Sequence, residues 1–239
     1  MKKIVRTIAT MGLVILFPLA AGASPVLHVV VGELTGCKNH EDVAKVVHDM
    51  NAGSAGNGGP QAYAWAPVHH DGAGNTVAVT FVAPSLNEYG KQIDGFSSSQ
   101  NSGTAQKLYD CMRVVGRSAD RILMGPTTVA DDVTVVDRSV WTLNPQCSDG
   151  DLLSLATSFN AWANQEGLPE RGIRRPLFGG AGNTVTTYGL YSSFEAYTDA
   201  MEKVNAAVEA NPDSTIGKLL KKAGTCLSPV SRSSARRLQ

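Results

Sequence analysis

Two adjacent histidines, His69 and His70, are the side chains of this sequence best suited to chemistry. An imidazole changes its charge near neutral pH, so either one could serve as a general base or a haem ligand. Both precede Asp71 at the end of an expected strand, and neighbouring residues on a strand point to opposite faces. At most one of the two can therefore enter a pocket, and the pair has poor geometry for ligating one metal ion together. The alternative interpretation is an exposed strand end.

An aromatic face precedes these histidines on the same expected strand, residues 61–68. Tyr63 and Trp65 alternate there and should point to one side of the sheet. Aromatic side chains beside a polar histidine suit a pocket for a small apolar ligand, although ordinary sheet packing produces the same pattern. We predict that Tyr63, Trp65, His69 and His70 form a ligand-binding set, with sheet packing as the alternative.

Three arginines, Arg171, Arg174 and Arg175, are close enough in the sequence to grip a carboxylate or a phosphate together. Glu166 and Glu170 lie beside them, so local ion pairs are the interpretation that we favour. The sequence has no serine-hydrolase motif, no paired-carboxylate spacing, and no cysteine pair with the spacing of a zinc site. We therefore assign no catalytic residue and expect no metal and no cofactor.

The first 23 residues have the layout of a secretory signal peptide. A basic head is followed by an apolar run over residues 7–19 and by the small-x-small pattern Ala21-Gly22-Ala23. The apolar run is shorter than the ~20 residues that a membrane span needs. We predict cleavage after Ala23 and a periplasmic or secreted mature protein.

The expected partners follow from the charge of the mature chain. Cleavage would remove three of the 21 basic residues and none of the 21 acidic ones. The resulting net charge of −3 predicts no general attraction to nucleic acid. No later stretch is long and apolar enough for stable insertion into a membrane, so a small-molecule ligand is the partner that we expect. The oligomeric state is left open.

One segment of the sequence occurs twice, 108 residues apart. Gly-Ala-Gly-Asn-Thr-Val stands at residues 72–77 and again at 180–185. A strand follows it, so a hairpin turn is favoured over a phosphate-binding loop. Downstream, capping boxes that begin at Ser85 and Ser192 each lead into an apolar stripe at helical spacing. The matching stripe positions are Leu86, Tyr89, Ile93 and Phe96 in one copy and Phe194, Tyr197, Met201 and Val204 in the other.

Each copy predicts the element order β-α-β-β-α, with a tail that could form a closing strand. The strands are expected over residues 26–34, 61–68 and 77–81, and over residues 133–143, 173–178 and those after 183. The closing strands would lie at 119–124 and 230–238, and the second helix of each copy is expected to break at 97–103 and 211–213. We predict a signal peptide over residues 1–23, a first unit over 24–126 and a second unit over 127–239.

Four cysteines, Cys37, Cys111, Cys147 and Cys226, predict disulfides in an oxidising compartment. Spacing alone leaves three pairings open. In each copy one cysteine precedes the first helix and one lies near the end of the second, so the duplication favours Cys37–Cys111 and Cys147–Cys226. In the chain-entropy account each bond would stabilise the fold by about 4 kcal/mol. Pairing between the copies is the alternative.

A β-α-β-β-α-β unit is the ferredoxin-like plan. With two such units, the chain resembles the dimeric α/β-barrel superfamily over nearly its whole mature length. The resemblance implies an α+β fold in which two ferredoxin-like repeats pack their antiparallel sheets face to face. Members include cofactor-independent monooxygenases, haem-handling enzymes and proteins with no known catalysis, and their ligands generally lie between the sheet and the helices of one unit.

These observations favour a binding protein over an enzyme. We expect an exported, disulfide-stabilised protein that binds a small ligand or a partner without catalysis. The alternative, which the resemblance implies, is a cofactor-independent monooxygenase or a haem-handling enzyme. A purely structural or self-assembling role is a third hypothesis.

Overall fold

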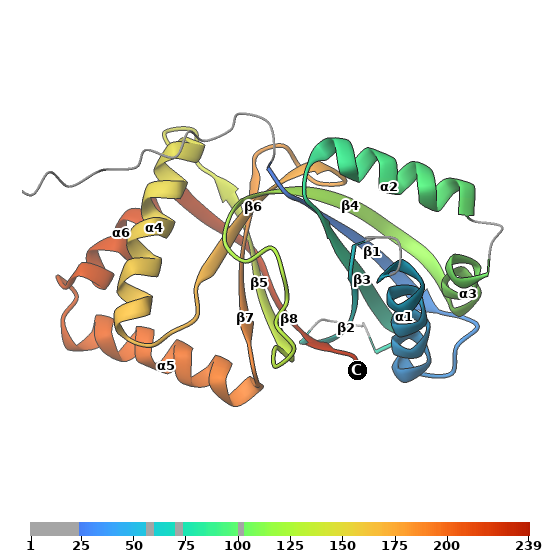
Figure 1. The fold of residues 1–239 in the computed structure, drawn as a ribbon. Helices are drawn as coiled ribbons and strands as arrows, with labels where there is room; N and C mark the ends of the chain where they lie inside the picture. Colours follow the sequence, from blue (N-terminus) through green and yellow to red (C-terminus); the bar gives the residue numbers. More distant parts are fainter. Residues whose placement is uncertain (1–23, 56–59, 70–73, 100–102) are drawn as a thin grey trace, which may run out of the picture.

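The computed structural model describes residues 24–55, 60–69, 74–99 and 103–239, and it has the predicted α+β architecture (Figure 1). The predicted signal peptide and His70 lie outside these residues. The first unit consists of β1 (Val26–Leu34), α1 (His40–Ala55), β2 (Ala62–His69), β3 (Thr76–Ala83), α2 (Leu86–Ser99), α3 (Thr104–Cys111) and β4 (Met112–Met124). The second unit consists of β5 (Val135–Leu143), α4 (Asp149–Gln165), β6 (Arg171–Phe178), β7 (Thr184–Tyr191), α5 (Phe194–Ala210), α6 (Thr215–Cys226) and β8 (Leu227–Arg237).

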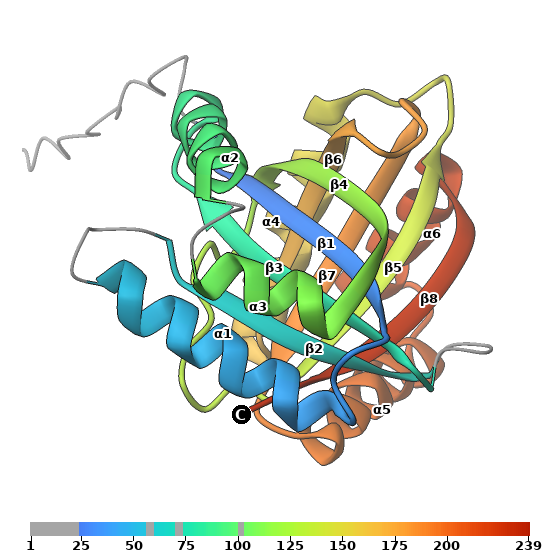
Figure 2. The same cartoon turned by 90° about the vertical axis from the view of Figure 1, so that its right-hand side faces the viewer.

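The eight strands form one closed antiparallel barrel in the order β1-β3-β2-β8-β5-β7-β6-β4. Each unit contributes four neighbouring strands, and the two four-stranded sheets face each other. They join at both edges, where β2 pairs with β8 and β4 pairs with β6. The helices of each unit lie outside its own sheet, as Figures 1 and 2 show for α1, α2 and α3. Closure therefore leaves no open sheet edge among the described strands.

Strand alternation decides which side chains face the helices and which face the inside of the barrel. On β3, Val77, Val79 and Phe81 are buried against the helices of the first unit. On β2, Ala62 and Ala64 join the same core, so the residues between and after them point into the barrel. Tyr63 and Trp65 therefore face the barrel interior.

The two units share polar contacts that link helix to strand. In the first unit the side chain of Asn51 donates a hydrogen bond to the carbonyl of Ala62 (2.8 Å) and accepts one from its amide (2.7 Å). Asn160 makes the same pair of contacts with Arg171 in the second unit, both at 2.9 Å. These matching contacts support our proposal that residues 24–126 and 127–239 are copies of one unit.

One of the two predicted helix caps is confirmed, because the Ser85 hydroxyl accepts from the amide of Glu88 at 3.1 Å. Ser148 and Asp151 form a complete capping box at the start of α4. The cap predicted at Ser192 is wrong, because Ser193 caps α5 through the amide of Ala196. None of the helices in the described part of the chain is long and apolar enough to cross a bilayer.

The structure joins Cys37 to Cys111 and Cys147 to Cys226, the pairing that the repeat predicted. The two Cα–Cα distances are 4.5 and 5.4 Å. In each unit the bond ties the residue before the first helix to the end of the last helix. Each disulfide therefore links the start of the first helix of a unit to the end of its last helix, outside the barrel.

Candidate ligand-binding site

A cavity of about 600 Å³, which we call the second-unit cavity, lies between the sheet of the second unit and helices α4, α5 and α6. Its walls are mainly apolar side chains from all three helices. Its floor is the sheet, which contributes Trp141, Arg171, Thr187, Tyr191 and Arg232 among others. An apolar hollow with a few fixed polar groups at one side is typical of small-molecule sites.

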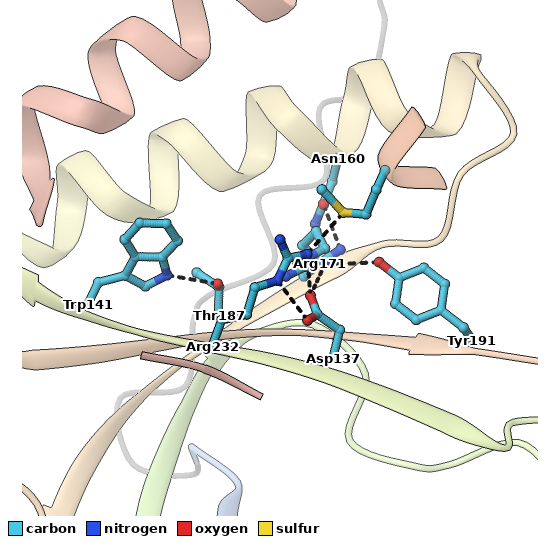
Figure 3. A network of polar contacts seen from close by, with 8 residues as sticks. Asp137, Trp141, Asn160, Arg171, Thr187, Tyr191 and Arg232 are labelled. Carbon is cyan, nitrogen blue, oxygen red and sulfur yellow. Dashed lines mark hydrogen bonds and ion pairs between the residues drawn. The ribbon is translucent and has the colours of Figure 1, made fainter. Parts of the chain in front are cut away.

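The floor carries a buried ion cluster, consisting of Asp137, Arg171 and Arg232 (Figure 3). Asp137 is completely buried on β5, and both arginines reach it from strands β6 and β8. Nη1 of Arg171 lies 2.9 Å from Oδ2 of Asp137, and Nε of Arg232 lies 3.2 Å from Oδ1. Arg171 and Arg232 line the cavity and Asp137 does not, so the positively charged residues of the cluster are the ones that border it.

Neighbouring side chains fix both arginines. Arg171 also donates from Nη1 to the hydroxyl of Tyr191 at 2.9 Å. The guanidinium of Arg232 lies 5.6 Å from the ring centre of Tyr197 and donates to the sulfur of Met201 at 3.1 Å. Burial alone would lower the pKa of Arg232, but its hydrogen bond to Asp137 and the charge of that carboxylate raise the pKa above its usual value. Arg232 is therefore a permanent cation.

In the first unit the corresponding hollow has a volume of only about 40 Å³. The residues paired across the strands also differ between the two units. His28 on β1 lies opposite Phe81 on β3, whereas Asp137 on β5 lies opposite Gly189 on β7. The ring of Phe81 lies 4.9 Å from that of His28 and borders the small hollow of the first unit, whereas the ring of Tyr191 occupies the space beside Gly189 in the second unit. The two units thus share a backbone plan but differ in the space between sheet and helices.

His28 should make the fold less stable in mild acid. Burial, with a smaller contribution from Arg117, lowers its pKa to about 4, and its Nδ1 lies 3.1 Å from the hydroxyl of Tyr89. The unfolded imidazole has a pKa of about 6.5, so between pH 6.5 and 4 the unfolded state takes up a proton that the folded state does not. The free energy of unfolding is expected to fall by about 3 kcal/mol over this range, because each unit of pKa shift corresponds to about 1.4 kcal/mol.

This loss can be measured by urea unfolding of wild type and His28→Gln from pH 7 to 4. The variant should lose the part of the pH dependence that His28 causes. His48→Gln, at an exposed position on α1, is the matched control and should behave like wild type. Identical pH profiles for wild type and His28→Gln would contradict the prediction.

The structure does not bring the predicted ligand set to the second-unit cavity. Tyr63 and Trp65 are buried and pack with Val133, their ring centres 6.4 Å apart. Tyr63 also borders a second hollow, of about 680 Å³, between α1 and the end of the chain. The backbone of His69 pairs with Ser234 on β8, but its side chain lies outside what the structure describes, as does all of His70. The set as a ligand site stays a prediction.

The partners predicted for the three arginines are wrong. Instead of Glu166 and Glu170, three aspartates from other elements pair with them. These aspartates lie on β4, which pairs with β6, on β5, which is separated from β6 by β7, and at the start of α4. The pairs are Arg171–Asp137 at 2.9 Å, Arg174–Asp120 at 3.1 Å and Arg175–Asp149 at 3.4 Å. A signal for the first pair was present in the sequence, since Asp137 follows Val135 on the same, buried face of its strand. No cluster of three or more metal-ligating side chains occurs among the described residues.

Comparison with known proteins gives matches in structure but not in sequence. No protein-family model and no curated protein matches the chain. An anthrone oxidase-like protein is similar with a TM-score of 0.55 at 12% identity, over 90% of this chain and 92% of its own. A proposed monooxygenase from Fusobacterium nucleatum subsp. nucleatum has a TM-score of 0.59 at 9% identity, and the match covers 91% of this chain and 94% of the monooxygenase. A haem-binding protein from Thermus thermophilus has a TM-score of 0.55 at 8% identity, and the match covers 91% of this chain and 92% of the haem-binding protein.

The chain therefore has the fold of the dimeric α/β-barrel superfamily, as its sequence predicted. At these low identities the likeness establishes the fold and nothing about the ligand, because one fold hosts many functions. What the chain binds has to be argued from its own cavities.

Proposed function

We propose that this chain is an exported, disulfide-stabilised protein that binds a small, largely apolar molecule in the second-unit cavity without catalysing a reaction. The observation that carries the proposal is the cavity itself, about 600 Å³ with apolar walls and an ordered polar floor. A volume of this order suits a drug-sized ligand. The two disulfides support export, because such bonds persist in oxidising compartments.

Binding is favoured over catalysis by the ionisable groups at the cavity. Within the described part of the chain, its lining includes no histidine, cysteine, lysine or carboxylate. General acid–base catalysis needs a group that exchanges a proton near the working pH. Asp137 lies beneath two arginines, and burial raises the pKa of nearby Tyr197, so that its phenol stays protonated. The floor can orient a ligand but is poorly suited to moving protons.

A haem group does not fit the donors at this cavity. Haem iron is held by histidine, cysteine, methionine or tyrosine side chains. Residues 127–239 contain no histidine, and both of their cysteines form a disulfide. The sulfur of Met201 accepts a hydrogen bond from Arg232, and the hydroxyl of Tyr191 accepts one from Arg171. The similarity to a haem-binding protein therefore does not extend to an axial ligand in this unit.

Blocking the cavity should weaken the binding of a neutral apolar dye. Gly224 on α6 borders the cavity, and a Cβ atom at this position would meet no heavy atom within 4 Å. Gly224→Trp therefore places an indole at the cavity without a backbone clash. We expect wild type to bind Nile red, and the variant to bind it about tenfold more weakly, a change of ~1.4 kcal/mol.

Fluorescence titration of the mature protein measures this effect. Gly90→Trp is the matched control, because Gly90 lies on helix α2, has equally open surroundings and does not border the cavity. Equal dye binding by both variants would place the dye elsewhere, and no binding by wild type would contradict the proposed function. Consumption of oxygen with an apolar phenol or quinol would favour the monooxygenase alternative.

A further inference from the structure

We infer that the ligand of the second-unit cavity is an apolar molecule with a single carboxylate, which pairs with Arg171 and Arg232. This inference rests on the proposed function and adds the chemical class of the ligand. It is argued from three properties of the ion cluster: its charge, the hydrogen-bond donors that it leaves free, and its position at the base of an apolar cavity.

The charge of the cluster is incomplete without an anion. Two guanidinium groups share one carboxylate, which leaves one excess positive charge at the floor. Among the described residues that line the cavity, no acidic side chain offsets it. An unbalanced charge beside apolar walls is costly, and a bound anion would remove that cost.

The geometry of the cluster leaves donors for this anion. Contacts to Asp137, Tyr191 and Met201 use Nη1 of Arg171 and Nε and Nη2 of Arg232. Each guanidinium has five N–H donors, so both retain donors of their own. The side chains of Arg171 and Arg232 are 17% and 48% exposed, and both border the cavity. A carboxylate at the floor can therefore reach them without displacing Asp137.

The excess of one positive charge favours a monoanion. A carboxylate neutralises it, whereas a dianionic phosphate would leave a net negative charge in the apolar cavity. Planar carboxylates also match the fork of an arginine side chain. The rest of the ligand would contact the apolar walls, since these make up most of the lining.

Calorimetric titration of the mature protein with dodecanoate, dodecanol and dodecyl phosphate, each below its micelle concentration, tests the inference. Dodecanoate should bind about tenfold or more tightly than dodecanol, because a charge-assisted hydrogen bond contributes that much. Arg232→Gln should abolish this preference, so that dodecanoate and dodecanol bind to the variant about equally, and Arg232→Lys should retain part of it. Arg117→Gln is the matched control, because Arg117 lies opposite Val30 on β1 as Arg232 lies opposite Ser139 on β5. It should behave like wild type.

The outcomes separate this inference from the proposed function. If neither dodecanol nor Nile red binds, the proposed function fails. If both bind but dodecanoate has no advantage, or its advantage survives Arg232→Gln, only the carboxylate assignment fails. Tighter binding of dodecyl phosphate than of dodecanoate would overturn the monoanion argument.

Discussion

Replacing Asp137 with alanine is expected to lower the free energy of unfolding by about 3–5 kcal/mol, the cost of removing one partner of a buried ion pair. Asp137 is completely buried and is the shared partner of Arg171 and Arg232. Arg232 is half-exposed and can turn toward water. The side chain of Arg171 is only 17% exposed, so most of the loss comes from its uncompensated charge.

Urea unfolding at neutral pH measures this effect. Asp213→Ala is the control, because Asp213 pairs with Lys221 at the surface, where the two side chains are 80% and 65% exposed. An exposed pair contributes about 0–1 kcal/mol. The double variant Asp137→Leu/Arg171→Leu should be more stable than Asp137→Ala, since it removes the buried unpaired charge as well. A loss in Asp137→Ala no larger than that in Asp213→Ala would show that the cluster is not a buried network.

The arrangement of the elements could be predicted from the sequence because its signals are local. The run of β-forming residues over 26–34 predicts β1 with its observed bounds, Val26–Leu34. The breaks expected in the second helix of each copy separate α2 from α3 and α5 from α6. The cysteine pairing could also be predicted from the sequence, since it required only the order of elements in each copy. In each case neighbouring residues carry the information.

The candidate site could not be predicted, and a one-residue shift is the main reason. The copies were matched at a constant distance of 108 residues, which holds for β3 and β7. The register places His28 opposite Phe81 and Asp137 opposite Gly189, so β1 and β5 correspond at a distance one residue longer. A shift of one residue exchanges the two faces of a strand. The same shift relates β2 to β6, since Ala62 lies opposite Phe81 and Arg171 opposite Gly189. At 108 residues Arg171 matches Tyr63, but in the barrel it corresponds to Ala62, which faces the helices.

Long-range pairing is the second reason. The contact between Arg232 and Asp137 joins residues 95 positions apart, on strands whose pairing follows only from the barrel topology. The residue that pairs with the first strand of each unit at this point also differs, Phe81 in one unit and Gly189 in the other. Neither difference alters the periodicity from which the elements were predicted.

Removing the Cys147–Cys226 disulfide by a double serine substitution is expected to cost about 4 kcal/mol of stability in the chain-entropy account. The two bonds close loops of similar length, with sequence separations of 74 and 79. The same change at Cys37 and Cys111 should therefore cost about as much. Urea unfolding of the two variants beside wild type measures both losses. A loss below about 1 kcal/mol in either variant would contradict the entropic account.

The two disulfide variants should nonetheless differ in ligand binding. Cys147 precedes α4 and Cys226 ends α6, and both helices form walls of the second-unit cavity. Cys37 and Cys111 join α1 to α3 on the other side of the barrel. Nile red titration under conditions where both variants remain folded should show weaker binding only without Cys147–Cys226. Equal binding by the two variants would mean that this disulfide stabilises the chain but does not hold the walls of the cavity in place.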